Sequence, residues 1–187
     1  MRSWQGAGFE MGRKRAMTSP RDRGRSTSVP DDTGVLIDHI LTRFHEAHRR
    51  ELPELVRLAA KVEAVHSDHP EVPRRLAVML EALRLDLEEH MQKEEAILFP
   101  LMRQGGGHPM IVHPIAQMRR DHEAHCEHLR RLKEIANDFR WPDGACRSWQ
   151  ALYAGASKFV DDLMEHTHLE NRVLFPRFED RQGLDAP

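Results

Sequence analysis

The sequence predicts an all-α protein that folds as an up-down-up-down antiparallel four-helix bundle. Four stretches repeat apolar residues at alternating spacings of three and four, which is the period of one helix face. Short segments that contain proline or glycine separate these stretches, and no stretch shows the alternation typical of a strand. Short connections between long helices favour antiparallel neighbours, and this gives the bundle.

The 187 residues suffice for one domain, and their composition divides them unevenly. Residues 1–34 are rich in arginine, serine, glycine and proline, and we expect a disordered basic tail there. Residues 35–180 carry the helical pattern and should form the bundle. Because the basic charge is concentrated in the tail, the rest of the chain is acidic, which argues against a nucleic-acid surface on the folded part.

The first two expected helices cover residues 35–66 and 76–99. Pro53 lies within the first and should kink it, because proline lacks the N–H of a helical hydrogen bond. In the second, the three-four spacing continues along one stripe as far as Ile97. We expect Pro100 and the glycine run that follows it to end this helix.

The other two expected helices cover residues 111–139 and 145–178, with a break at the Trp-Pro-Asp-Gly segment between them. Both keep the same apolar register. In the last helix the alternation of four and three is expected to continue without interruption as far as Val173.

A polar motif occurs twice on these helices, 76 positions apart. His90 and Glu94 precede Leu-Phe-Pro, and His166 and Glu170 precede the same three residues. Each His-Glu pair has the spacing i, i+4, which places both side chains on one helix face, one turn apart. This is a spacing at which a helix can supply two ligands to one metal site.

A further histidine precedes each copy at a similar interval. His45 lies 45 residues before His90, and His122 lies 44 residues before His166. Each half of the chain therefore offers one histidine and one His-x-x-x-Glu motif, which suggests two metals on a pseudo-two-fold axis. The predicted ligands are His45, His90, Glu94, His122, His166 and Glu170.

These ligands occupy stripe positions that leucines fill elsewhere on the same helices. A buried carboxylate without a partner costs several kcal/mol, and a metal pair would offset this cost. Two glutamates can bridge both metals while the histidines divide two to each, leaving positions for a solvent bridge or a small ligand. Imidazole and carboxylate together suit iron, with manganese and zinc as alternatives, and suit calcium or magnesium poorly. The expected cofactor is two iron ions with an oxo or hydroxo bridge.

Other histidines are expected outside this ligand set. His48 and His125 lie about one turn from His45 and His122, as alternative ligands or partners of ligands, although core packing is the simpler interpretation. His66 is too far along its helix to reach the same centre. The following are interpreted as solvated: His39, His69, His108, His113, His128 and His168.

Two aspartates and the two cysteines complete the candidates. Asp86 and Asp121 either accept the second N–H of a ligand imidazole or carry only surface charge. Cys126 is expected to be a small buried residue. With Cys146 as the only other cysteine, no disulfide framework is indicated and a reducing cytoplasm is expected. No apolar run approaches the roughly 20 residues that cross a bilayer.

The motifs resemble those of hemerythrin-type His-His-Glu domains and, more closely, those of the di-iron repair-of-iron-centres (RIC) family, over about residues 35–178. The segments that carry this resemblance are His45-x-x-His48 followed by Glu51-Leu52-Pro53-Glu54-Leu55, then Lys61-Val62-Glu63-x-Val65-His66, then His90-Met91-x-Lys93-Glu94-Glu95-x-Ile97-Leu98-Phe99-Pro100, and Asp161-Asp162-Leu163-Met164 leading into His166-x-x-Leu169-Glu170-Asn171-x-Val173-Leu174-Phe175-Pro176-Arg177.

The resemblance implies that the six predicted ligands bind iron, with Glu94 and Glu170 as bridges. RIC proteins are implicated in restoring iron-sulfur clusters damaged by nitric oxide or peroxide. The resemblance therefore implies a cytoplasmic stress protein that donates iron to damaged or apo iron-sulfur proteins. One departure is visible: the full-length family has an N-terminal domain with an adjacent cysteine pair, and residues 1–34 contain no cysteine. A step that needs this thiol pair would require another polypeptide.

Oxygen-carrying hemerythrins differ in two ways. Their third helix supplies His-x-x-x-His, whereas Cys126 stands four residues after His122 here, and their fourth helix ends in His-x-x-x-x-Asp rather than His-x-x-x-Glu. Three functions remain open: an iron-donating repair protein, a module that carries or senses oxygen or nitric oxide, and a di-iron enzyme such as a nitric oxide reductase. The sequence gives no indication of the oligomeric state.

Overall fold

The computed structural model of the 187-residue chain describes residues 30–106 and 109–179, so most of the expected tail and His108 lie outside the described residues. Within these ranges the chain is helical and contains no strand. The α-helices are α1 (Thr33–Ile40), α2 (Glu46–Val65), α3 (Leu76–Lys93), α4 (Phe99–Arg103), α5 (Val112–Ile135), α6 (Arg147–Leu169) and α7 (Pro176–Glu179). Three π-helical turns, Leu41–His45, Glu94–Leu98 and Glu170–Leu174, join some of them end to end, and 3-10 turns form at Pro109–Ile111 and Asn137–Phe139.

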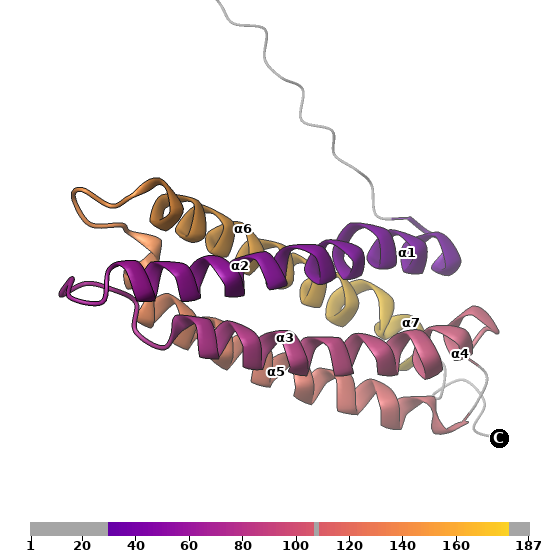
Figure 1. Ribbon diagram of the computed structural model, residues 1–187. Helices are drawn as coiled ribbons and strands as arrows, with labels where there is room; N and C mark the ends of the chain where they lie inside the picture. Colours follow the sequence, from indigo (N-terminus) through magenta and orange to yellow (C-terminus); the bar gives the residue numbers. More distant parts are fainter. Residues whose placement is uncertain (1–29, 107–108, 180–187) are drawn as a thin grey trace, which may run out of the picture.

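These helices make four long segments that run alternately up and down (Figure 1). The segments are α1 with α2, α3 with α4, α5 alone, and α6 with α7. Helix α2 packs against both α3 and α6, and α3 packs against α5, so the segments enclose a common interior. The predicted all-α four-helix bundle is confirmed.

The first segment begins two residues before the predicted start and departs from α geometry at an unexpected place. The carboxylate of Asp32 caps α1 by accepting a hydrogen bond of 2.9 Å from the backbone N–H of Val35. Helix α2 then continues through Pro53. The change in helical register lies earlier, in the π turn Leu41–His45, and not at the proline where a kink was predicted.

The π turns change which residues face the core. Ile97 was predicted on the buried stripe, but its exposure is 56%, whereas that of Leu98 is 1%. Val173 is likewise only half-buried, and Leu174 is fully buried in its place. A π turn contains one residue more per turn than an α-helix, so the inward face moves on by one position. The prediction of an uninterrupted three-four spacing was therefore wrong at both places.

The second segment also continues past the predicted end at Pro100. Pro100 lies in the first turn of α4, directly after the π turn Glu94–Leu98, and the helix ends only at Arg103. Proline is tolerated in the first turn of an α-helix. Pro176 occupies the same place after the third π turn, as the first residue of α7.

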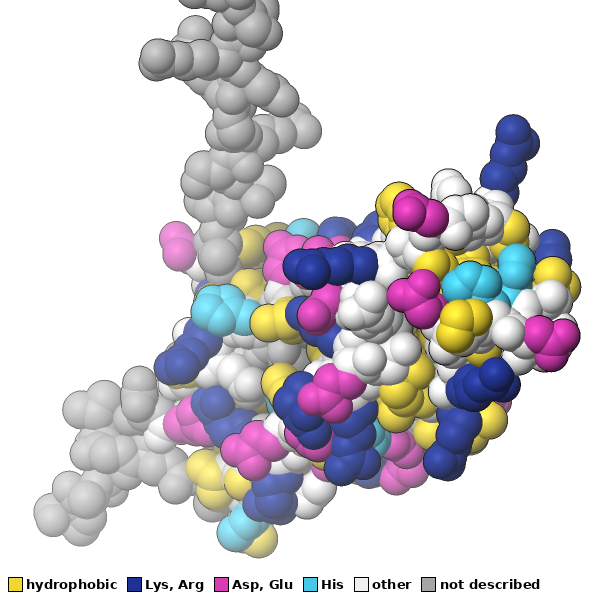
Figure 2. Space-filling view, turned by 90° about the vertical axis from the view of Figure 1, so that its left-hand side faces the viewer, with side chains coloured by type: hydrophobic (Ala, Val, Ile, Leu, Met, Phe, Trp, Pro, Cys, Tyr) yellow, Lys and Arg dark blue, Asp and Glu magenta, His cyan; other side chains and the backbone are white. Residues whose placement is uncertain are grey.

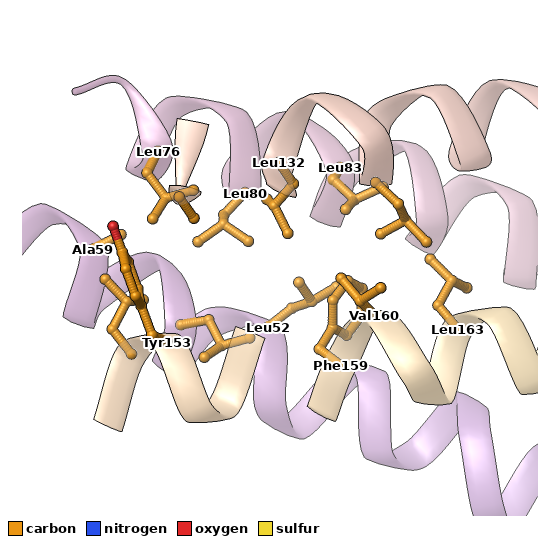
Figure 3. Close-up of a cluster of buried hydrophobic side chains, with 14 of the residues drawn as sticks. Leu52, Ala59, Leu76, Leu80, Leu83, Leu132, Tyr153, Phe159, Val160 and Leu163 are labelled. Atoms are coloured by element: carbon orange, nitrogen blue, oxygen red, sulfur yellow. The ribbon is translucent and has the colours of Figure 1, made fainter. Parts of the chain in front are cut away.

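The apolar interior is divided into two clusters along the bundle axis. The larger one lies between α2, α3, α5 and α6 and includes Leu52, Leu80 and Phe159, whose side chains face the same interior (Figure 3). The other lies at the end formed by α1, α4 and α7 and includes Ile37 and Phe175. The buried polar residues lie between these two clusters.

A glycine closes the end of the bundle near α4. Gly106 has a φ of 65°, and a Cβ placed on it would lie 2.1 Å from Cδ1 of Phe178. Both the left-handed backbone and the close approach of the ring require that no side chain be present. This contact joins the second segment to the fourth.

The opposite end of the bundle shows charges of both signs interspersed, with apolar side chains between them and no single basic patch on that face (Figure 2). Among the described residues, no helix combines the length and the apolar character needed to cross a membrane.

Candidate metal centre

The six polar residues that the sequence singled out come together in the middle of the bundle. Each of the four segments contributes, and each side chain is at most 2% exposed although all six are polar. They lie between the two apolar clusters. The residues are His45, His90, Glu94, His122, His166 and Glu170.

Their ligand atoms form two adjacent groups that share both glutamates, and in each group all atoms lie within 4.8 Å of one another. In the first group, the Nε2 atoms of His45 and His166 are 3.2 Å apart. In the second, those of His90 and His122 are 3.1 Å apart. Two ligands at right angles, each about 2.1 Å from one ion, lie about 3 Å apart, so these separations fit a pair of ligands on one metal.

Each glutamate directs one oxygen toward each group. Glu94 Oε2 lies 3.5 Å from His45 Nε2, and Glu94 Oε1 lies 3.5 Å from His90 Nε2. Glu170 Oε1 lies 3.2 Å from His166 Nε2, and Glu170 Oε2 lies 3.1 Å from His122 Nε2. Both carboxylates therefore have the orientation of a bridge between two neighbouring cations.

The π turns place these ligands. Glu94 and Glu170 are the first residues of their π turns, and His45 is the last residue of the first π turn. His122 lies in the uninterrupted helix α5. π turns inside α-helices occur frequently at functional sites, because the extra residue redirects the side chains around it.

The buried acids of the site lie beside imidazoles but receive no hydrogen bond from the residues that the structure describes. None of the four carboxylate oxygens of Glu94 and Glu170 accepts a hydrogen bond from the described residues. Burial and the nearby Glu170 raise the pKa of Glu94 well above its usual value. Burial acts in the same direction on Glu170, but His166 and the other imidazoles outweigh it and lower the pKa of Glu170. Cations between the groups would satisfy both acids as anions.

The histidines are suited to bind metal as neutral imidazoles. Burial, together with the neighbouring His166, lowers the pKa of His45 to about 4, and burial lowers that of His90 to about 3. His45 Nδ1 lies 2.7 Å from the carboxylate of Glu95, which can only accept, so Nδ1 carries the proton. The lone pair of His45 is then on Nε2, which faces the site.

Together these features form two adjacent buried His/Glu sites consistent with a di-iron centre. The sequence matches the family described as the hemerythrin HHE cation binding domain over residues 36–178. The chain belongs to this family.

This hemerythrin HHE domain is similar to several proteins named for iron-sulfur cluster repair. It is 49% identical over 144 residues to the iron-sulfur cluster repair protein YtfE of Dickeya chrysanthemi (strain Ech1591), covering 77% of this chain and 65% of that protein. It is 48% identical to YtfE of Yersinia pseudotuberculosis serotype O:1b (strain IP 31758), covering 76% and 64%, and 45% identical to a probable iron-sulfur cluster repair protein of Haemophilus influenzae, covering 76% and 63%. The chain thus spans slightly less than two thirds of the length of these relatives.

The hemerythrin domain also contains outer partners for its histidines that the sequence analysis missed. Glu95 holds His45, and Arg49 Nη1 in turn donates to the same Glu95 oxygen at 2.8 Å. Asn171 Oδ1 lies 3.0 Å from His122 Nδ1 and accepts a hydrogen bond from Arg119 at 3.3 Å. Glu95 directly follows Glu94, and Asn171 directly follows Glu170, so the two partners occupy the same position in the repeated motif.

The two aspartates differ. Asp121 Oδ2 lies 3.4 Å from His90 Nδ1, which fits the expectation that Asp121 accepts the second N–H of a ligand imidazole. Asp86 is exposed and lies 3.7 Å from His128, away from the ligands. Both line a surface groove of about 200 Å³ between α3 and α5, which reaches the buried His125.

Aromatic rings cover the ligands of the domain. Phe44 stacks on His166 with ring centroids 5.2 Å apart, and Phe175 stacks on His122 at 5.9 Å. The interplanar angle is 5° in both cases. These rings keep water away from the site and fix the orientation of the imidazoles.

The remaining candidates lie elsewhere. Cys126 is exposed, so its prediction as a buried residue was wrong: it follows the inward-facing His125 directly and turns away from the interior. His66 lies at the far end of α2, with its Nε2 3.1 Å from the sulfur of Cys146. His39, His113 and His168 are exposed as expected, and His69 and His128 are half-buried.

Proposed function

We propose that this chain binds two non-haem iron ions with an oxo or hydroxo bridge and donates iron to iron-sulfur proteins damaged by nitrosative or oxidative stress. The observation that carries the proposal is the symmetric arrangement in which two carboxylates are each oriented toward two histidine pairs. The proposed ligands are His45 and His166 for one ion, His90 and His122 for the other, and Glu94 and Glu170 as bridges.

The residues of this site suit metal exchange. Each ion would have two imidazole nitrogens and two carboxylate oxygens from the protein, which leaves coordination positions for exchangeable ligands. When bound, iron is both the ion to be donated and the centre that provides these open coordination positions. The neutral imidazoles bind without first losing a proton, and the aromatic rings over them keep the site out of bulk water.

The similarity to iron-sulfur cluster repair proteins supports the same role. The proposed partners are damaged or apo iron-sulfur proteins of the cytoplasm. Because those relatives are longer than this chain, the proposal concerns what the di-iron domain can do with its own residues.

The test is transfer of iron to an acceptor. Iron-loaded protein, freed of unbound iron, is incubated anaerobically with an apo iron-sulfur enzyme, a sulfide source and a thiol reductant. We expect the enzyme to recover activity while iron leaves the loaded protein, and a Glu94→Leu variant to transfer less. Retention of both irons with no reactivation would refute donation.

The open coordination positions also favour a second candidate, binding of oxygen or nitric oxide. A reversible oxygen or nitric oxide adduct with full retention of iron would support a carrier or sensor. Sustained consumption of nitric oxide or peroxide, at many turnovers per site, would instead indicate a di-iron enzyme.

A further inference from the structure

Two buried histidines lie beside the proposed ligands. His48 is 1% exposed and His125 is 3% exposed. Nε2 of His48 and Nδ1 of His125 are buried and have no hydrogen-bond partner among the described residues. An unpartnered buried polar atom costs about 1–3 kcal/mol, which leucine or phenylalanine would avoid while filling the same space. Core packing therefore does not explain why these two residues are histidines.

The two residues are equivalent within the internal repeat. His48 follows His45 by three positions, and His125 follows His122 by three. His45 and His122 are 77 positions apart, and so are His48 and His125. The additional histidine thus belongs to the same duplicated unit that supplies the ligands, and both lie on the side of the site that faces the larger apolar cluster.

Each additional histidine adjoins one ligand pair. The rings of His48 and His166 have centroids 5.4 Å apart, and those of His125 and His90 are 5.0 Å apart. Within the ligand pairs themselves, the corresponding distances are 4.9 Å for His45 with His166 and 4.8 Å for His90 with His122. The additional imidazoles are thus nearly as close to a ligand ring as the two ligands of one pair are to each other.

We propose that His48 and His125 are reserve ligands, each of which can bind the metal ion held by the adjacent histidine pair through its unpartnered nitrogen. This inference rests on the di-metal site proposed above. His48 would serve the ion of His45 and His166, and His125 the ion of the other pair. A third imidazole would occupy a position otherwise left to solvent, and it would hold an ion while a carboxylate bridge opens.

The test uses His48→Phe and His125→Phe, which keep a ring of similar shape and remove the nitrogens. His66→Phe is the matched control, because His66 is a half-buried histidine at the C-terminal end of the helix that contains His48 but lies remote from the site. Three quantities are measured: iron bound per chain, Fe²⁺ affinity by competition with a chelator, and the melting temperature of the apoprotein.

We expect each variant to fold, with an apoprotein melting temperature equal to or above that of the wild type, because an unpartnered polar atom has been removed. The affinity for one of the two ions should fall by about 10-fold or more, the range seen when groups around a metal site are lost. The control should keep wild-type affinity. If the phenylalanine variants do not fold, His48→Leu and His125→Leu answer the same question.

The outcomes separate this inference from the proposed function. If wild-type protein binds two irons and both variants bind them with unchanged affinity, the reserve-ligand role is wrong and the di-iron site stands. An equal loss of affinity for both ions, accompanied by a lower apoprotein melting temperature, would also overturn the role, since it would indicate damaged packing. If wild-type protein does not bind a pair of irons, the proposed function itself fails.

Discussion

Arg49 holds Glu95 with two hydrogen bonds, one to each carboxylate oxygen, of 2.8 and 3.2 Å. Glu95 in turn fixes the ring of His45 through Nδ1. The same guanidinium also binds Glu88 on α3, so a surface ion-pair network extends into the buried site. The orientation of a proposed ligand in the first segment therefore depends on residues of the second.

The first prediction concerns this outer partner. Glu95→Leu should weaken binding of one iron by about 10- to 100-fold, because His45 loses the acceptor that sets its tautomer and orientation. Chelator competition with Fe²⁺ measures the change. Glu81→Leu, which removes an acid of α3 in the same segment but far from the site, is the control and should bind iron as the wild type does. Equal affinity in both variants would show that Glu95 has no such role.

The second prediction concerns the bridges. Glu94→Leu or Glu170→Leu should lower the metal content to at most one ion per chain. Glu94→Leu should also raise the unfolding free energy of the apoprotein by about 1–4 kcal/mol, since a buried carboxyl whose charged form is disfavoured is replaced by an apolar side chain. Metal analysis and denaturant unfolding of metal-free protein measure the two effects. Two ions in either variant would rule out the bridging role of that residue.

The third prediction concerns an ion-pair network beside α6. Burial alone would raise the pKa of Asp162, but hydrogen bonds from Arg43 at 2.7 Å and Lys158 at 2.8 Å outweigh it and lower this pKa to about 2. A carboxyl whose pKa falls on folding stabilises the protein above its unfolded pKa of about 3.9, and this stabilisation disappears as the pH drops toward 2.

Asp162→Asn should accordingly lower the unfolding free energy by about 1–2 kcal/mol at neutral pH. The difference in unfolding free energy between wild type and variant should shrink as the pH falls below about 4. Urea unfolding at a series of pH values gives both numbers. A gap that stays constant down to about pH 3 would show that the charge of Asp162 is not responsible.

The fourth prediction uses two neighbouring glycines. Gly106→Ala should destabilise the protein by more than about 1–2 kcal/mol, because it adds a clash with Phe178 to the cost of a left-handed backbone. Gly105→Ala shares a positive φ, of 93°, but its Cβ would meet no atom within 4 Å, so it isolates the backbone contribution. Thermal unfolding of both variants compares them. Equal melting temperatures would mean that the Phe178 ring yields without cost.

The sequence was sufficient to predict the four helices and the convergence of the six polar residues, because the i, i+4 spacing of His90 and Glu94 recurs in His166 and Glu170 at stripe positions. The π turns could not be predicted in this way. The apolar pattern is compatible with either Ile97 or Leu98 facing inward, and in the structure it is Leu98 that lies in the cluster with residues of α1, α4 and α7.

The outer partners were missed for a related reason. In a regular helix, Glu95 and Asn171 lie about 100° around the axis from the inward-facing glutamates that precede them, so the pattern assigns them to the surface. They contact His45 and His122 from the edge of the bundle. Pairing across helices depends on how the segments are rotated against each other, which a stripe pattern does not specify.

The π turns have a consequence for how such a domain can change in evolution. Removing one residue from Glu94–Leu98 would restore an α-helix and bring Leu98 to the position that an unbroken three-four spacing assigns to Ile97, so α4 would keep its inward face. Phe99 and Met102 would then stay in the interior, whereas Glu94 would lose the local π geometry in which it is oriented. Point substitutions at the surface are free to accumulate, whereas a single-codon deletion here would act on the orientation of a proposed metal ligand in one step and leave the hydrophobic cluster in place.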